Sequence, residues 1–301
     1  MANQGWAPED LDDFGDEPPQ WLRIGVAMSS SSESIGGSPT GPTPSQLDAL
    51  CRALAPRIGI AVTAQAFSDY RALLSAINRG DADLAWLPPL VALRSASAGR
   101  TLPIVLPIRG GAAWYASALF AQPNITVSSI RDLRSVRVAW VDPQSTAGFL
   151  VIRAWMRAQQ IDFNLAFSQQ TFFGSHAAVV QAVLRGHADV GATYAHLDHS
   201  LKNIRSAAWG SAPVQVIAMA GPIPNDVLSA SIRLPVSTIR SIRDALIHQD
   251  DALRAATSAL LNAEGFIAAE TEHMSPLMKV LKHMDDTGRR LTSIIPPPQK
   301  P

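Results

Sequence analysis

The chain has no excess of charge of either sign. Among its 301 residues, 25 Lys and Arg balance 25 Asp and Glu, so the formal net charge is zero. A protein without a strong electric field has little means of attracting nucleic acid or an anionic membrane surface. The sequence also contains no run of about 18 apolar residues, the length of a membrane-spanning helix. We therefore expect neither a nucleic-acid partner nor direct insertion into a membrane.

Cysteine and N-terminal basic residues are scarce as well. Cys51 is the single cysteine, so no internal disulfide can form, and its place in the apolar pattern of residues 47–54 indicates a core position rather than a reactive thiol. Residues 1–20 hold six acidic residues and no Lys or Arg, unlike a secretory signal. We expect an acidic, disordered tail and a cytoplasmic protein, or a periplasmic one if the true start lies upstream.

The patterns typical of catalysis are missing too. No Ser/His/Asp order with nucleophile-elbow glycines, no Walker lysine after residues 36–41 and no Cys-based metal pattern occurs. His196 and His199, with His187 and Asp198 close by, can share a helical face and bind a metal, but solvated histidines on a surface helix are favoured because no complete ligand set has a diagnostic spacing. We expect no catalytic residue, cofactor or metal.

What the chain does contain is an internal repeat. Residues 69–84 and 175–190 read as copies of each other with a constant offset of 106. Each copy is an amphipathic helix that ends at a glycine and is followed by an Asp and a short β-rich run, which predicts an αβ unit. The Asp83 and Asp189 pair occupies equivalent places, which indicates turn and helix-end geometry rather than catalysis.

The repeat predicts an α/β protein with two similar lobes, and 301 residues with 47% apolar side chains can bury two cores. In the first lobe we expect strands at 21–27, 58–63, 84–87 and 228–233, a Ser/Gly/Pro-rich loop at 29–45, and helices at 46–54, 70–79, 236–247 and 252–261. In the second we expect strands at 114–120, 136–141, 167–172 and 190–193 and helices at 146–159 and 176–184.

These elements predict a division of the chain. Residues 1–20 form a tail, 21–106 plus 220–285 the first lobe, 107–219 the second lobe including a return crossing near 213–218, and 286–301 a proline-rich tail. The hinge then comprises two strands, at about residues 103–113 and 209–220. Two lobes of one design usually face each other across a cleft, where small molecules bind.

The most specific local feature is the segment 140–150. A strand ends, Pro143 turns the chain, and Ser145 and Thr146 supply hydroxyls at a helix start, whose N–H groups and dipole favour an anion. A plain Ser/Thr N-cap is the alternative interpretation. His176 follows a second small-residue turn into a helix and is a further candidate donor, with a surface capping residue as the alternative.

In these segments the chain resembles the phosphonate/phosphite/phosphate-binding (PhnD-like) proteins of ABC importers, which have the type 2 periplasmic-binding-protein fold. The resemblance covers about residues 21–275 and rests on the segments 22–26, 69–70, 80–87, 115–117, 142–150, 174–176 and 221–226. It implies that Ser145, Thr146 and the backbone of Ala147 bind phosphonate oxygens and that His176 donates to them. It also implies that Tyr70 and Tyr115 close on the ligand from the opposite side and from the hinge.

Two departures from the family pattern bear on the ligand. Ala147 stands where relatives that bind aminophosphonates place a third hydroxyl, so only its N–H remains. Of the acidic residues that hold an ammonium group in such relatives, Asp226 is matched, whereas the acid expected in residues 193–197 is replaced, by Ala195. We expect phosphate, phosphite or a small alkylphosphonate to bind in preference to 2-aminoethylphosphonate, with Asp226 accepting a hydrogen bond from a protonated oxyanion.

The resemblance implies a solute-binding protein that closes on its ligand about the hinge. Its partner is then an ABC permease, or a signalling protein if the chain is a cytoplasmic sensor. The alternative is a cytoplasmic enzyme of cofactor biosynthesis on the same fold, similar to chorismate dehydratases. Turnover separates the two classes, because a binding protein releases its ligand unchanged.

Overall fold

The computed structural model describes residues 17–27, 42–125, 133, 135–143, 145–163, 165–198 and 203–278. Three expected features fall outside these residues: the acidic tail up to residue 16, most of the loop at 29–45, and the proline-rich tail at 286–301. His199, half of the candidate metal pair, also lies outside them. The fold that follows is therefore that of the two expected lobes.

The first lobe is built on a six-stranded sheet. Its strand order is β12 (Gly265–Ala268), β4 (Thr101–Ile108), β11 (Val227–Ser231), β3 (Leu84–Leu87), β1 (Trp21–Ala27) and β2 (Ala61–Phe67). The β1, β2 and β3 strands are parallel, and β11, β4 and β12 add antiparallel pairings. One face packs against α1 (Pro44–Ile58), α6 (Val236–Ile247) and α7 (Asp251–Leu261), and the other against α2 (Tyr70–Arg79) and α3 (Pro89–Ser97).

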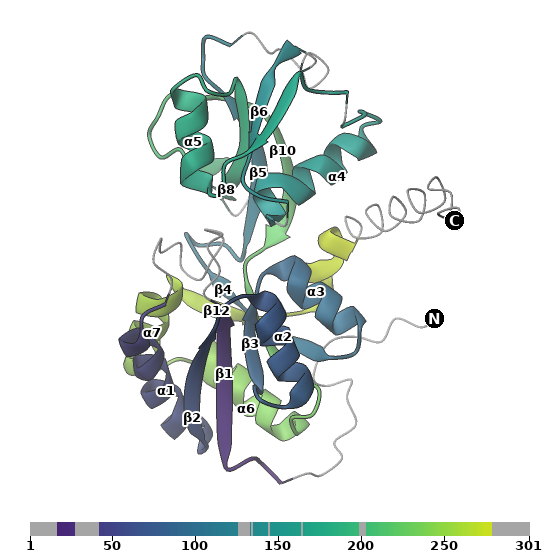
Figure 1. Ribbon diagram of the computed structural model, residues 1–301. Coiled ribbons are helices and arrows are strands. Elements are labelled where there is room, and N and C mark those ends of the chain that lie inside the picture. The colour runs from purple at the N-terminus through teal and green to yellow at the C-terminus, as the bar shows by residue number, and fades with distance from the viewer. Residues whose placement is uncertain are drawn as a thin grey trace, which may run out of the picture.

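The second lobe repeats this design. Its sheet has the order β10 (Gln215–Pro224), β5 (Trp114–Ala121), β8 (Val190–Leu197), β6 (Arg137–Trp140) and β7 (Gln169–Phe172), with β9 (Ile204–Ala207) paired to β8. Its helices are η4 (Thr146–Leu150), a π-helical turn that leads into α4 (Val151–Ala158), and α5 (His176–Leu184). The two sheets with their helices form two separate bodies in Figure 1, which confirms the expected two-lobed α/β class.

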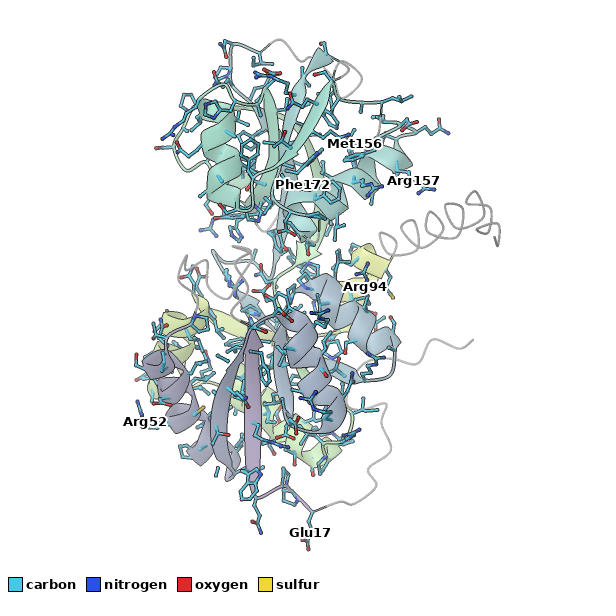
Figure 2. The ribbon with its side chains drawn as sticks, viewed as in Figure 1. Glu17, Arg52, Arg94, Met156, Arg157 and Phe172 are labelled. Carbon is cyan, nitrogen blue, oxygen red and sulfur yellow. The ribbon has the colours of Figure 1, made fainter. Side chains whose placement is uncertain are left out.

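The carboxyl ends of the parallel strands in each lobe point toward the other lobe. Glu17, which precedes β1, lies at the end of the first lobe far from the second, so β1 runs toward the second lobe. Phe172 ends β7 and lies in the part of the second lobe nearer to the first (Figure 2). Ligands of open α/β sheets bind at such carboxyl edges. The region between the lobes is therefore where the predicted site residues are expected to meet.

The sequence repeat corresponds to one structural device used twice. Arg23, in β1, donates to Asp83 from its backbone N, Nε and Nη2, each at 2.9 Å. Arg137, in β6, donates to Asp189 from the same three groups at 2.7, 3.1 and 2.7 Å. The hydrogen bonds from Arg137 lower the pKa of the Asp189 carboxyl. Each aspartate lies in the turn before a strand, β3 or β8, and is hydrogen-bonded to the start of the parallel strand beside it, β1 or β6. This is the structural role in the turn that the sequence predicts.

The chain crosses between the lobes at other residues than we expected. β4 continues to Ile108 in the first sheet, so the first crossing spans residues 109–113. β10 continues through Pro224 and pairs with β5 in the second sheet, although residues 220–224 were expected in the first lobe. The return therefore runs through Asn225 and Asp226, not 209–220. Gly221 and Pro222 lie within β10, at a shift in its register against β5.

Four further elements differ from the sequence expectation. α3, β9 and β12 were not predicted, and β8 extends to Leu197 instead of ending at residue 193. His196 consequently lies on a strand, not on a helix that it shares with His199. The extension has a physical reason, since β8 is paired along residues 190–196 by β5 on one side and near its end by β9 on the other. Paired neighbours override the weak local signal of this segment.

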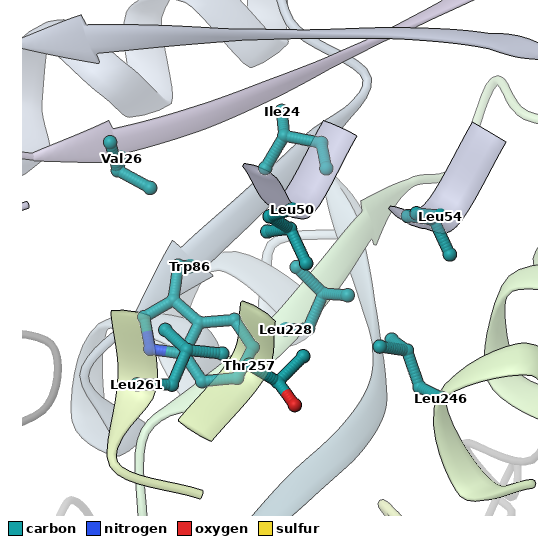
Figure 3. Close-up of a pocket in the computed structure, with 9 residues that line it drawn as sticks. All are labelled: Ile24, Val26, Leu50, Leu54, Trp86, Leu228, Leu246, Thr257 and Leu261. Carbon is teal, nitrogen blue, oxygen red and sulfur yellow. The ribbon is translucent and has the colours of Figure 1, made fainter. Parts of the chain in front are cut away.

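The first lobe also contains a small apolar pocket between its sheet and α1, α6 and α7 (Figure 3). Its lining residues are Ile24, Val26, Leu50, Leu54, Trp86, Leu228, Leu246, Thr257 and Leu261. The Trp86 ring is 4% exposed and meets Phe266 edge-on, with 6.2 Å between ring centroids. Trp86 is therefore a core residue of the first lobe. Cys51 is buried nearby in α1, and burial raises the pKa of its thiol to about 11, which keeps it protonated and unreactive.

We predict that Asp83→Asn lowers the free energy of unfolding by about 1–2 kcal/mol, because it weakens three hydrogen bonds from Arg23 to a charged acceptor. Urea titration at pH 7 measures this change. Asp81→Asn is the matched control, since Asp81 forms an exposed ion pair with Arg79, and such pairs contribute little. Equal effects of the two substitutions would contradict a structural role for the Asp83 interaction.

Candidate functional site

Two helix starts meet at one edge of the second sheet. η4 follows β6 and α5 follows β7, and β6 is parallel to β7, so both helices begin at the same carboxyl edge. Ser145 and Thr146 begin η4 and are 2% and 1% exposed. The Ser145 hydroxyl oxygen accepts a hydrogen bond from the Gly148 N–H at 2.9 Å. The N-cap interpretation therefore holds for Ser145, but a hydroxyl that accepts still has a proton to donate to an anion.

η4 is unusually close to the strand that precedes it. A Cβ on Gly148 would lie 2.2 Å from Val141 Cγ2 and 2.7 Å from Ser145 Oγ, so only glycine fits here. The turn is a π-helix, a form that occurs often at functional sites. Close packing of this kind fixes where the backbone N–H groups of the helix start point, and it explains why a glycine stands at residue 148.

Ala147 is held from the neighbouring strand. Its carbonyl oxygen accepts a hydrogen bond from the Ser117 hydroxyl of β5, and its side chain is fully buried. The residue can offer an anion only its backbone N–H, as the sequence predicts. Ser117 was not singled out in the sequence, because nothing local shows that β5 passes under η4.

His176 is a buried residue and not a surface cap. It is 2% exposed, and its Nδ1 lies 2.7 Å from Thr193 Oγ1. The cap of α5 is instead Ser175, whose hydroxyl oxygen accepts from the Ala178 N–H at 3.1 Å. The contact with Thr193 holds the imidazole at the carboxyl edge of the sheet, which suits a donor to a bound anion.

Four aromatic rings line up beside this edge. Tyr115 is buried in β5, and its ring centroid is 6.2 Å from that of His196. The centroid of Tyr194 is 5.4 Å from that of His196 and 5.0 Å from that of His176. Burial, with the charge of Arg109, lowers the pKa of His196, so its imidazole is neutral at neutral pH. From the sequence we predicted that Tyr115 and His176 contact the oxyanion, but we made no such prediction for Tyr194 or His196. The sequence does contain a signal for these two residues: Tyr194 and His196 alternate with the apolar Ala195 and Leu197, so both face the same side of the strand.

Tyr70 belongs to the opposite lobe. It is the first residue of α2, which follows the carboxyl end of β2, and Asp69 caps that helix by accepting from the Ala72 N–H at 2.8 Å. Its side chain is partly buried. The structure therefore places Tyr115, Ser145, Thr146, Ala147 and His176 together in the second lobe, and Tyr70 on the lobe that faces them.

Asp226 lies in the return crossing and pairs with Arg109 of the first crossing. Both Nη atoms of Arg109 are 3.4 Å from Asp226 Oδ2, and the two side chains are 13% and 7% exposed. Arg109 also donates from Nε to the Leu261 carbonyl at 2.9 Å. Asn225 links the same crossings by donating from Nδ2 to the Pro107 and Ala112 carbonyls at 2.9 and 3.1 Å. The carboxylate expected to meet the ligand is thus paired within the hinge.

The part of the chain that the structure describes lacks both a metal-binding cluster and a membrane-spanning helix. There, no group of three or more His, Cys, Asp or Glu side chains is arranged to hold a metal ion. In the same residues, no helix has both the length and the apolar composition needed to cross a bilayer.

The chain is similar to known proteins in sequence and in fold. Residues 42–274 match a family described as ABC transporter, phosphonate, periplasmic substrate-binding protein. The phosphate-import protein PhnD of Mycolicibacterium smegmatis is 25% identical over 187 residues, and the match covers 58% of this chain and 58% of that relative. The chain thus spans less than two thirds of the length of this curated relative.

Two solved structures share the fold. XAC2383 from Xanthomonas citri bound to ATP has a TM-score of 0.68 and 18% identity, covering 89% of this chain and 99% of that one. PhnD1 from Prochlorococcus marinus in complex with methylphosphonate has a TM-score of 0.61 and 17% identity, covering 88% and 98%. At these low identities, the TM-scores establish a common fold and nothing about the ligand.

We predict that Gly148→Ala lowers the free energy of unfolding by about 1–3 kcal/mol, because the added methyl group overlaps the branched side chain of Val141. Thermal and urea unfolding measure the effect. Gly265→Ala is the control, because its Cβ would lie 3.8 Å from the Ile108 side chain, an ordinary contact distance. A Gly148→Ala protein as stable as the control would show that η4 is not packed as described.

We predict that Asp226→Asn destabilises the protein by about 2–4 kcal/mol, since it leaves the Arg109 charge buried without its partner. Asp244→Asn serves for comparison, because Asp244 pairs with Arg243 while 62% exposed. Differential scanning calorimetry of both variants measures the difference. Equal melting temperatures for the two variants would mean that the hinge pair contributes nothing to stability.

Proposed function

Because this chain belongs to the family of periplasmic substrate-binding proteins of ABC phosphonate transporters, we propose that it captures a small phosphorus oxyanion between its lobes for import. The observation that carries the proposal is the meeting of two helix starts, with Ser145, Thr146 and His176, at one sheet edge. The family consists of binding proteins, so the alternative of a cofactor-biosynthesis enzyme is not supported.

We propose that the second lobe binds the oxyanion first. Hydroxyl groups of Ser145 and Thr146, the N–H of Ala147 and the imidazole of His176 are donors to its oxygens, and the helix dipoles add a favourable field. Tyr115 contacts the ligand from the hinge side. Tyr70 then covers it from the first lobe, so the site is complete only when the lobes are closed.

Closure is the mechanism that this arrangement favours. Residues 109–113 and 225–226 are the short crossings about which the lobes can rotate. A ligand shifts the equilibrium toward the closed form only if it binds that form more tightly. Tyr70 supplies such a differential contact because it lies on the other lobe from the four donors.

We propose phosphate, phosphite or a small alkylphosphonate as the ligand class. The names of two similar proteins, a phosphate importer and a methylphosphonate complex, support ligands without an ammonium group. The ion pair between Arg109 and Asp226 supports the same preference, since the acidic side chain that matches an ammonium-binding residue of the relatives is already paired with a cation. An ammonium ion would lose its hydration there without gaining an anionic partner.

We further propose that the partner is an ABC permease and that the protein acts in the periplasm. The description of the family supports both proposals over the cytoplasmic sensor that the acidic N-terminal residues favour. A permease would then recognise the closed form of the two lobes. Fractionation of cells that produce the native gene product tests the location.

The proposed function is tested by thermal shift with phosphate, phosphite, methylphosphonate, 2-aminoethylphosphonate and sulfate. We expect a phosphorus oxyanion at about a hundredfold excess over its Kd to raise Tm by about 5 °C or more, because it binds only the folded state. The Ser145→Ala/Thr146→Ala double variant should lose this shift, whereas Ser258→Ala, on the exposed face of α7, should keep it. Unchanged melting with every compound would refute the proposal.

A further inference from the structure

His196 lies between Tyr115 and Tyr194 beside the candidate site, although the sequence analysis considered it only as a metal-binding residue and gave it no role toward the oxyanion. Its ring centroid is 6.2 Å from Tyr115 on one side and 5.4 Å from Tyr194 on the other, and Tyr194 leads on to His176 at 5.0 Å. The residue is near the carboxyl end of β8, the same edge at which η4 and α5 begin. A ring between Tyr115 and His176 borders the ligand that both are proposed to contact.

The hydrogen bonding of this imidazole is incomplete. Its Nδ1 is shielded from solvent and has no hydrogen-bond partner in the part of the chain that the structure describes. Native proteins rarely leave a buried polar atom unpaired, and they tolerate an unpaired acceptor better than an unpaired N–H. A neutral ring therefore keeps Nδ1 as a bare acceptor and carries its proton on Nε2. In that form it offers a ligand one N–H donor and no charge.

The charged side chain that acts on the His196 imidazole is a cation, Arg109, which together with burial lowers the pKa of the ring. Arg109 is in turn paired with Asp226, whose Oδ2 lies 3.4 Å from both Nη atoms. The rings of Tyr115 and Tyr194 flank the imidazole. This part of the site therefore favours an anion or an uncharged substituent over a cation.

On the basis of the proposed function, we propose that His196 is a specificity-determining residue that donates one hydrogen bond from Nε2 to the bound oxyanion. Neither the neutral His196 ring nor Asp226, which is paired with Arg109, offers an ammonium group an uncompensated anionic partner. Small phosphorus oxyanions and alkylphosphonates are thereby selected over aminoalkyl phosphonates. The hydrogen bond from Nε2 holds the oxyanion, and the uncharged ring forms no ion pair with an amine.

The test compares His196→Glu, His196→Leu and the wild type by calorimetric titration with methylphosphonate and 2-aminoethylphosphonate. The Leu variant loses the donor and should bind methylphosphonate about tenfold more weakly. The Glu variant places a carboxylate beside the ligand, so it should also gain affinity for the amine and shift the ratio of the two Kd values by about a hundredfold. His187→Glu, at an exposed histidine of the same lobe, controls for net charge and should leave both affinities unchanged.

The outcomes separate this inference from the proposed function. If Ser145→Ala/Thr146→Ala abolishes binding while both His196 variants keep the wild-type affinities, the site stands and the role of His196 is refuted. If the wild type binds none of the phosphorus compounds, both proposals fail. If circular dichroism shows that His196→Glu does not fold, His196→Leu decides, because wild-type affinity for methylphosphonate in that variant refutes the donated hydrogen bond.

Discussion

The site depends on the register of β6 against β8. Arg137 donates hydrogen bonds to Asp189 at the amino ends of these strands, and Val138 consequently lies opposite Val190. Because the strands are parallel, fixing one end also fixes which residues meet at the other. A slip of one residue would turn every side chain of β8 to the opposite face, and Tyr194 and His196 would leave the site. The same device holds β1 against β3 in the first lobe, through Arg23 and Asp83.

Steric constraint then converts a common turn into a specific helix start. Val141 leaves no room for a side chain at residue 148, and Ser117 of β5 holds the carbonyl of Ala147 from below. η4 is thus fixed by two strands at once, while His176 is fixed by Thr193 of a third. The proposed donors to the ligand therefore all lie in the second lobe. Tyr70 alone comes from the other lobe, so closure adds contacts without rearranging the donors.

Three arginines of the two lobes and the hinge are paired with aspartates, and this bears on how an anion can be bound. Arg23, Arg137 and Arg109 each face an aspartate, so none of them is an uncompensated cation for the ligand. The proposed donors are instead hydroxyls, a backbone N–H and imidazole rings. Hydroxyl, amide and imidazole donors recognise an oxyanion by the directions of its hydrogen bonds. Under this proposal, ligands are distinguished by the positions of their protonated oxygens and amino groups.

Local patterns in the sequence were sufficient for the duplicated αβ units, their helix ends and the turns that lead into η4 and α5. Gly80, Gly186, Asp69 and Ser175 act within a few residues of themselves, so their roles can be read from neighbouring positions. Tertiary structure alone decided where the chain returns after β10, that Asp226 pairs with Arg109, and that His196 is on a strand beside Tyr115. Those features join residues more than 80 positions apart, and only the pairing of distant strands brings such residues together.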